Sequence, residues 1–298
     1  MKLRIALFVV LVSSFTLAAD KSCDNGRGGY KMALADGFIL QVAPNTDGKC
    51  FAALTNQAGE PQYTTAGDES HIEFSATGRD LNADGKNDAV VETLQNGKHH
   101  YAVLTPGATP ALVREIITNE QLAFEDRLGD GKIEIFGREQ VFVGIDGLPQ
   151  DVSPAPMAIF RMSGNRIYPV MNLFWPEYEA DINQAKAYIS KDALAFLQGV
   201  SPKGADEHKP AEDAAVADTK GRILTVVLSY IYGGKPQLGW QYLMDNWQDR
   251  DKDRIRSLII SARNHGLLGE INANPPQPAP AAAQAAQPAP AATPVENK

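Results

Sequence analysis

The chain has 298 residues, a formal net charge of −8 and two cysteines. It carries no basic stripe with interleaved aromatic residues, so nucleic-acid binding is excluded as the expected function. An acidic balance repels anionic membrane surfaces and attracts divalent cations.

The first residues, 1–19, have the pattern of a secretory signal peptide. Lys2 and Arg4 precede an apolar stretch over residues 5–12, and small residues follow up to Ala18 and Ala19. A membrane-spanning helix needs roughly 20 apolar residues, which is more than this stretch offers. We therefore expect cleavage near Ala18 or Ala19, a periplasmic or secreted location, and no membrane-spanning segment.

The cysteines, Cys23 and Cys50, follow this segment. In an exported protein an even pair is most simply one disulfide, and the competing interpretation is two buried thiols. The export signal favours the disulfide. The glycine-rich residues 25–30 beside Cys23 lack a P-loop lysine and are expected to be a flexible lead-in.

Residues 20–175 have the pattern of an antiparallel β-rich domain. Short runs of β-formers are separated by turn residues about every eight to twelve positions, as in all-β assemblies. Asn96-Gly97 and Gly164-Asn165 are hairpin turn signals. The expected strands cover residues 37–44, 50–55, 71–76, 88–94, 98–104, 111–118, 132–137, 140–145, 157–163 and 166–171.

The hydrophobic period changes to that of helices over residues 176–273. Three amphipathic faces and one segment apolar nearly all round, 222–232, predict a helical domain. A polar stretch at about 201–218 is expected to be a linker or exposed loop, and the Pro/Ala-rich residues 274–298 a disordered tail. The fold class is therefore α+β. The three faces contain Ile182, Ala185, Ile189, Ala193 and Phe196; Trp240, Leu243, Met244 and Trp247; and Ile255, Leu258, Ile259 and Ala262.

One loop, "DLNADGKND", concentrates oxygen ligands. Counting from Asp80, side-chain oxygens fall at positions one, three, five and nine, and Gly85 at position six permits a tight turn. Hard oxygen ligands in this order suit Ca²⁺. Position twelve is apolar, so the loop is no complete EF-hand. The expected ligands are Asp80, Asn82, Asp84, Asp88 and the backbone carbonyl of Lys86.

This loop resembles that of the FG-GAP or VCBS-type repeat, in which D-x-[DN]-x-D-G-x-x-D joins two strands of a β-propeller blade. The resemblance implies an exported protein with a structural calcium ion. A closed propeller needs at least four blades, whereas the β-rich region offers about three. We therefore expect the helical part to cover an open sheet edge.

A second copy of the loop, "DRLGDGKIE", begins 46 residues later at Asp126. Asp126, Asp130 and Glu134 match three of the ligands, while Leu128 replaces Asn82. The second loop is therefore expected to be a weaker site that binds the ion poorly or not at all.

Other chemistry finds little support. His99 and His100 are neighbours in an expected strand, so they point to opposite faces and cannot easily share a metal ion. No G-x-S-x-G elbow supplies a serine nucleophile. The aromatic residues Tyr230, Tyr232, Trp240, Tyr242 and Trp247 are expected to be core first and a stacking surface second.

These observations favour a non-catalytic exported protein, a binding or scaffolding module with a structural calcium loop and an envelope protein or glycan as partner. Two alternatives stay open. One is an envelope hydrolase acting on glycan or peptidoglycan through a hidden carboxylate pair. The other is an inhibitor or regulator of another envelope protein.

Overall fold

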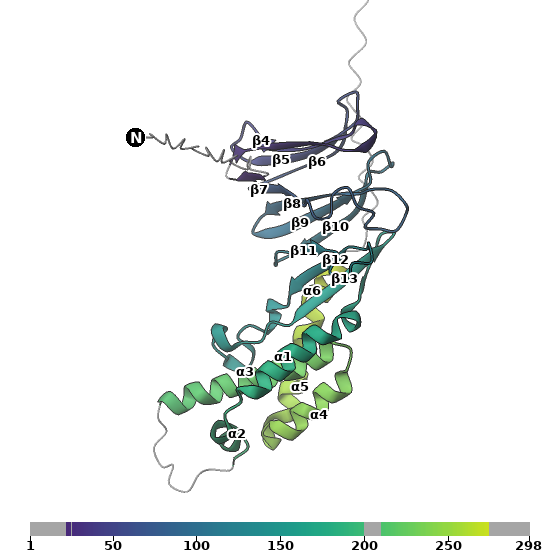
Figure 1. Cartoon of the computed structure of the whole chain (residues 1–298). Coiled ribbons are helices and arrows are strands. Elements are labelled where there is room, and N and C mark those ends of the chain that lie inside the picture. Colours follow the sequence, from purple (N-terminus) through teal and green to yellow (C-terminus); the bar gives the residue numbers. More distant parts are fainter. Residues whose placement is uncertain (1–21, 25, 200–209, 274–298) are drawn as a thin grey trace, which may run out of the picture.

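The computed structural model describes residues 22–24, 26–199 and 210–273. Three antiparallel sheets follow one another along the chain and are stacked, and a group of helices packs at one end of the stack (Figure 1). The expected α+β class is confirmed. The predicted signal peptide, half of the predicted linker and the predicted tail lie outside the described residues.

The first sheet lies farthest from the helices (Figure 1). Its apolar residues alternate, so that Leu40, Val42, Ala52 and Leu54 are buried against the second sheet. The strands pair in chain order and are β3 (Tyr30–Ala33), β4 (Ile39–Pro44), β5 (Cys50–Thr55) and β6 (Pro61–Gly67).

The second sheet occupies the middle of the stack. Its strand β8 is buried on both faces, because Ala89 and Val91 pack toward the first sheet and Val90 toward the third. The predicted Asn96-Gly97 turn is confirmed, with φ of 53° and 74°. The strands are β7 (Glu69–Ile72), β8 (Ala89–Gln95), β9 (Lys98–Leu104) and β10 (Leu112–Thr118), with β1 (Ser22–Asp24) and β2 (Arg27–Gly28) added beside β7.

The strand predicted over 71–76 ends at Ile72, and residues 74–78 form a turn instead. Phe74 and Ala76 nevertheless pack into hydrophobic cores. Alternation in the sequence was therefore a correct sign of burial and a misleading sign of strand structure.

The third sheet contains β11 (Ala123–Glu125), β12 (Glu134–Arg138), β13 (Met157–Ser163) and β14 (Arg166–Pro169). The strand predicted over 140–145 is wrong. Left-handed backbone at Gly144, Asp146 and Gly147 breaks the segment into 3₁₀ turns. Phe142 and Ile145 are buried without a strand. The turns are η2 (Gln140–Phe142), η3 (Ile145–Gly147) and η4 (Gln150–Val152).

The helices begin after the short turn η5 (Met171–Phe174). The face predicted from Ile182 to Phe196 is split between two helices, because the Ser190 hydroxyl caps a new helix by accepting from the N–H of Ala193 at 3.3 Å. The helices are α1 (Trp175–Ala187), α2 (Lys191–Leu197), α3 (Pro210–Tyr232), α4 (Pro236–Asn246), α5 (Lys252–His265) after η6 (Asp249–Asp251), and α6 (Leu267–Ala273).

The described part of the predicted linker is helical. Helix α3 begins at Pro210, so it includes residues 210–218. Alanine is frequent there, and alanine has the highest helix propensity. The apolar segment 222–232 forms the buried end of this helix, as predicted.

Two hydrophobic cores hold the stack together. One lies between the first and second sheets, and the other joins the second sheet, the third sheet and the helices. Helix α6 contacts the edge strands β10 and β14, and Arg114 of β10 donates to the carbonyl of Ile271 at 2.7 Å. The helical part therefore contacts an edge strand of the second sheet and one of the third, while coverage of an open sheet edge stays a prediction.

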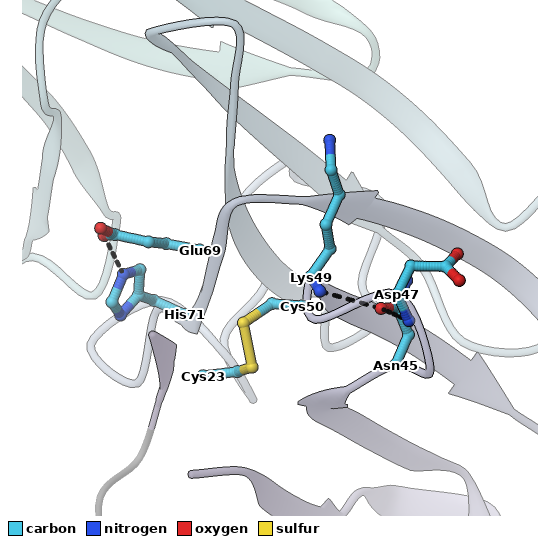
Figure 2. The surroundings of a disulfide bond; sticks show 7 residues. All are labelled: Cys23, Asn45, Asp47, Lys49, Cys50, Glu69 and His71. Carbon is cyan, nitrogen blue, oxygen red and sulfur yellow. Dashed lines mark hydrogen bonds and ion pairs between the residues drawn. A yellow bond between two sulfur atoms is a disulfide. The ribbon is translucent and has the colours of Figure 1, made fainter. Parts of the chain in front are cut away.

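The disulfide joins Cys23 of β1 to Cys50 of β5, with a Cα–Cα distance of 5.7 Å (Figure 2). Since β1 pairs with β7, the bond ties the second sheet to the first. The predicted pairing is confirmed. The predicted flexible lead-in is not, because residues 26–30 belong to a hairpin and the start of β3. A Cβ at Gly26 would lie 2.6 Å from the carbonyl oxygen of Gly48, so the hairpin requires glycine there.

Candidate metal centre

The first acidic loop connects β7 to β8 in the middle sheet. It closes on itself, since the N–H of Asp88 donates to the carbonyl of Arg79 at 2.8 Å. Leu81 is buried in the core between the second and third sheets. The carbonyl of Asn82 accepts from the N–H of Gly164, in the β13–β14 turn, at 2.6 Å. The loop is thus a fixed part of the contact between two sheets.

Asp80 organises the exposed side of this loop. Its carboxylate accepts from the backbone N–H of Asp84 at 3.2 Å and from that of Gly85 at 2.9 Å. Gly85 has a φ of 84°, a conformation that glycine adopts without strain. The N–H of Lys86 donates to the Asp84 carboxylate at 2.9 Å. The carboxylates of Asp80 and Asp84, at positions one and five, therefore both accept hydrogen bonds from the backbone of the same turn.

Asp88 forms the buried side. It is 1% exposed, and its carboxylate accepts from the N–H of Leu81 at 2.9 Å, from that of Asn82 at 3.3 Å and from the hydroxyl of Thr105 at 2.5 Å. Burial raises the pKa of Asp88, and repulsion from Asp84 acts in the same direction. These hydrogen bonds oppose the rise without cancelling it.

Asn82 bridges the two sides. Its side-chain amide donates to Asp84 at 3.3 Å and to the hydroxyl of Thr105 at 3.4 Å, and its side-chain oxygen accepts from the N–H of Asp84 at 2.9 Å. Asp84, Asn82, Thr105 and Asp88 thus form one chain of contacts. The four predicted side-chain ligands are gathered at one loop.

The carboxylates of the first loop lack a paired cation among the described residues. Within residues 22–24, 26–199 and 210–273, none of its three carboxylates forms an ion pair with lysine or arginine. Across the same residues, no group of three or more His, Cys, Asp or Glu side chains stands ready to hold a metal ion. The predicted ligand set includes an amide and a backbone carbonyl, and Asp84 is exposed.

The second loop connects β11 to β12 and repeats four of the hydrogen bonds of the first. Asp126 accepts from the N–H groups of Asp130 and Gly131, both at 3.1 Å. Asp130 accepts from the N–H of Lys132 at 3.1 Å. Glu134 accepts from the N–H of Arg127 at 3.0 Å, as Asp88 does from Leu81. The offset of 46 residues in the sequence is therefore an equivalence in three dimensions.

The two loops differ in what contacts the carboxylates at positions five and nine. In the second loop the guanidinium of Arg161 donates to Asp130 at 2.9 and 3.0 Å and to Glu134 at 2.8 Å. Backbone hydrogen bonding from Lys132 lowers the pKa of Asp130, and Arg161 lowers it further. Leu128, the residue in place of Asn82, is 43% exposed.

The histidines do not form a site together. The Nδ1 atom of His99 lies 2.5 Å from Glu92, and that of His100 lies 3.1 Å from Glu115. Glu92 belongs to β8 and Glu115 to β10, on opposite faces of the sheet. The prediction that His99 and His100 point to opposite faces is confirmed. Of the aromatic cluster predicted to be core, Tyr232 and Trp247 are buried, whereas Tyr230, Trp240 and Tyr242 are half-buried.

The sequence analysis missed a carboxyl pair between the second and third sheets. Glu92 is 3% exposed and accepts from the hydroxyl of Tyr101 at 3.1 Å. Burial raises the pKa of Glu73 to about 7, with repulsion from Glu92 and a hydrogen bond to it acting in the same direction. Glutamate inside an apolar strand, as in "AVVETL", was the available signal.

This carboxyl pair lies beside an open groove. Glu73 lines the groove, which has a volume of about 560 Å³. Its wall also contains Phe124, Phe136, Arg138 and Met157. The groove therefore combines a carboxyl group with apolar and cationic side chains.

Comparison with known proteins adds no further constraint, since no family model, curated protein or solved structure matches the chain. In the part of the chain that the structure describes, no helix has both the length and the apolar character needed to cross a membrane.

Proposed function

We propose that this chain is an exported, non-catalytic binding or scaffolding protein whose first loop binds one structural calcium ion. One observation carries the proposal. Two loops share the same backbone frame. The second presents its carboxylates to a protein cation, whereas no lysine or arginine of the described residues pairs with those of the first. Asp80, Asn82, Asp84 and Asp88, with the Lys86 carbonyl, would supply the oxygen ligands that Ca²⁺ prefers.

The role of the ion would be structural. It would bring two positive charges to three carboxylates that otherwise repel one another. Since the loop carries Leu81 into the core and hydrogen-bonds to the β13–β14 turn, the ion would also fix the contact between the second and third sheets.

The FG-GAP or VCBS resemblance and the export prediction belong to the same proposal. Three antiparallel sheets, two of which carry an acidic loop between consecutive strands (β7–β8 and β11–β12), support the resemblance. The Cys23–Cys50 disulfide supports an oxidising compartment, periplasmic or extracellular. An envelope protein or glycan would be the partner.

Calorimetric titration of the chain without residues 1–19 tests the calcium site. We expect one equivalent of Ca²⁺ to bind, and Asp84→Ala to abolish the heat. Asp47→Ala, which removes an exposed carboxylate from the β4–β5 turn, is the matched control and should bind as the wild type does. Absence of heat and of thermal stabilisation at millimolar Ca²⁺ would refute the site.

A second candidate is an envelope hydrolase, and the Glu73–Glu92 pair is the observation that favours it. A carboxyl group with a pKa of about 7 beside a groove is suited to general acid catalysis near neutral pH. Release of soluble fragments from dye-labelled peptidoglycan would be measured. This candidate requires release by the wild type, and loss of release in a folded Glu73→Gln variant; no release by the wild type rejects it.

A further inference from the structure

We infer that Arg161 is a built-in cation that takes the place of a metal ion in the second loop. The residue pair Thr105 and Arg161 would then decide which of the two loops requires Ca²⁺. The inference rests on the proposed function only in that the first loop is taken to bind the ion.

Strand register places Thr105 and Arg161 at equivalent positions. Ala89, just after the first loop, pairs with Leu104, and Ile135, just after the second loop, pairs with Phe160. Leu104 is followed by Thr105 in the second sheet, and Phe160 is followed by Arg161 in the third. Each contacts the position-nine carboxylate of its own loop, Asp88 or Glu134.

The guanidinium of Arg161 is suited to this role. It is planar, always charged, and offers several N–H donors to carboxylates at once. The Arg161 side chain is 7% exposed, and it contacts the carboxylates of both Asp130 and Glu134. These residues match Asp84 and Asp88, two of the proposed calcium ligands.

A second arginine completes the balance of charge. Arg79 donates to the Asp126 carboxylate at 3.2 Å and to the carbonyl of Gly131 at 3.4 Å. Together with Arg161 it places two positive charges on a loop with three carboxylates, the charge that one Ca²⁺ ion would bring. Among the residues that the structure describes, no lysine or arginine forms an ion pair with a carboxylate of the first loop.

Leu128 agrees with this assignment. A loop that no longer coordinates an ion has no need of the side-chain oxygen at position three. The exposed Leu128 provides none, whereas its counterpart Asn82 is 3% exposed and bonded on both sides.

The experiment uses calcium titration in the full chain without residues 1–19, in the Asp84→Ala background so that only the second loop is observed. We expect no binding in Asp84→Ala alone, and one equivalent once Arg161→Thr and Leu128→Asn are added. Adding Asp130→Ala to that variant should remove the new site.

The reciprocal variant, Thr105→Arg in the otherwise natural chain, should lose the calcium heat of the first loop and become insensitive to chelator. Thr105→Val, which adds no charge, is its control and should bind within about tenfold of the wild type. Circular dichroism establishes that each variant is folded. If Arg161→Thr does not fold even with calcium, Thr105→Arg decides the matter.

The outcomes separate the two claims. Three results would overturn the role of Arg161. The first is a folded Arg161→Thr, Leu128→Asn variant without a new site. The others are a Thr105→Arg variant that is folded and binds calcium as the wild type does, or one that is unfolded. A wild type without any site, together with a new site in the Arg161→Thr variant, would leave the role of Arg161 intact and reject the proposed function.

Discussion

Ala83 and Gly129 occupy the same position in the two loops, and both adopt left-handed backbone, with φ of 61° and 67°. That conformation is strained for alanine and free for glycine. No close contact would meet a Cβ at Gly129, so any cost of adding one there comes from the backbone.

Exchanging the two residue types should therefore change stability in opposite directions. We expect Ala83→Gly to stabilise the chain by about 0.5–1 kcal/mol, and Gly129→Ala to destabilise it by a similar amount. Urea unfolding at saturating Ca²⁺ measures both. If both substitutions stabilise the chain, or both destabilise it, the structural equivalence of the loops is contradicted.

Glu73 makes stability depend on pH. Its pKa rises from 4.5 in the unfolded chain to about 7 in the folded one. The folded state therefore favours the protonated form. The stabilisation is fully present below about pH 4.5 and is lost as pH rises to about 7.

Glu73→Gln should remove this dependence because the amide cannot ionise. At pH 8 the variant should be more stable than the wild type by about 1–3 kcal/mol, while near pH 4.5 the two should be alike. The exposed Glu179→Gln is the control. Denaturant unfolding across this range gives the result, and parallel pH profiles for wild type and Glu73→Gln would exclude the buried carboxyl pair as the cause.

At the scale of elements, strands rich in β-formers and bounded by turn residues were predicted well. The runs 50–55, 98–104 and 157–163 coincide with β5, β9 and β13. Five strands were missed, because pairing with neighbouring strands defines them: β1, β2, β3, β6 and β11. A strand was predicted over 140–145 because burial of Phe142 and Ile145 imitates the pattern of a sheet.

The small element β1–β2 depends on the disulfide for its attachment to the first sheet. Because Cys23 and Cys50 are 27 residues apart, replacing both by alanine should cost about 3–4 kcal/mol in unfolding free energy. Urea unfolding measures the loss. Wild type treated with a reductant should behave like the double variant, and a double variant as stable as oxidised wild type would show that pairing of β1 with β7 alone holds the hairpin.

At the scale of the whole molecule, the β-rich part and the helices are not independent. One continuous core contains Tyr101 of the second sheet, Phe160 of the third and Val227 of α3. The domain boundary near residue 175, which the change of period predicted, marks a change of secondary structure inside a shared core. We therefore expect one cooperative unfolding transition.

Calcium should move that transition as a whole. At a Ca²⁺ concentration about 100 times the dissociation constant, binding adds about 2.7 kcal/mol, or roughly 5–10 °C in Tm for a chain of this size. Scanning calorimetry with calcium and with chelator measures the shift, and Asp84→Ala should show none. Two transitions, of which calcium moves only one, would show that the β-rich part unfolds separately.

The sequence by itself determined the features that follow from local pattern: the change from strand to helix period, the cysteine pair, and the two acidic loops with their offset of 46 residues. Each depends on residues close together in the chain, or on a pair that has no rival partner. The tertiary structure alone decided which residues face the loops. Arg161 reaches Asp130 across 31 positions, and Glu73 meets Glu92 across a loop, because strand register and sheet stacking bring them together. Register is a long-range property, and no local periodicity encodes which charge will stand opposite a given carboxylate.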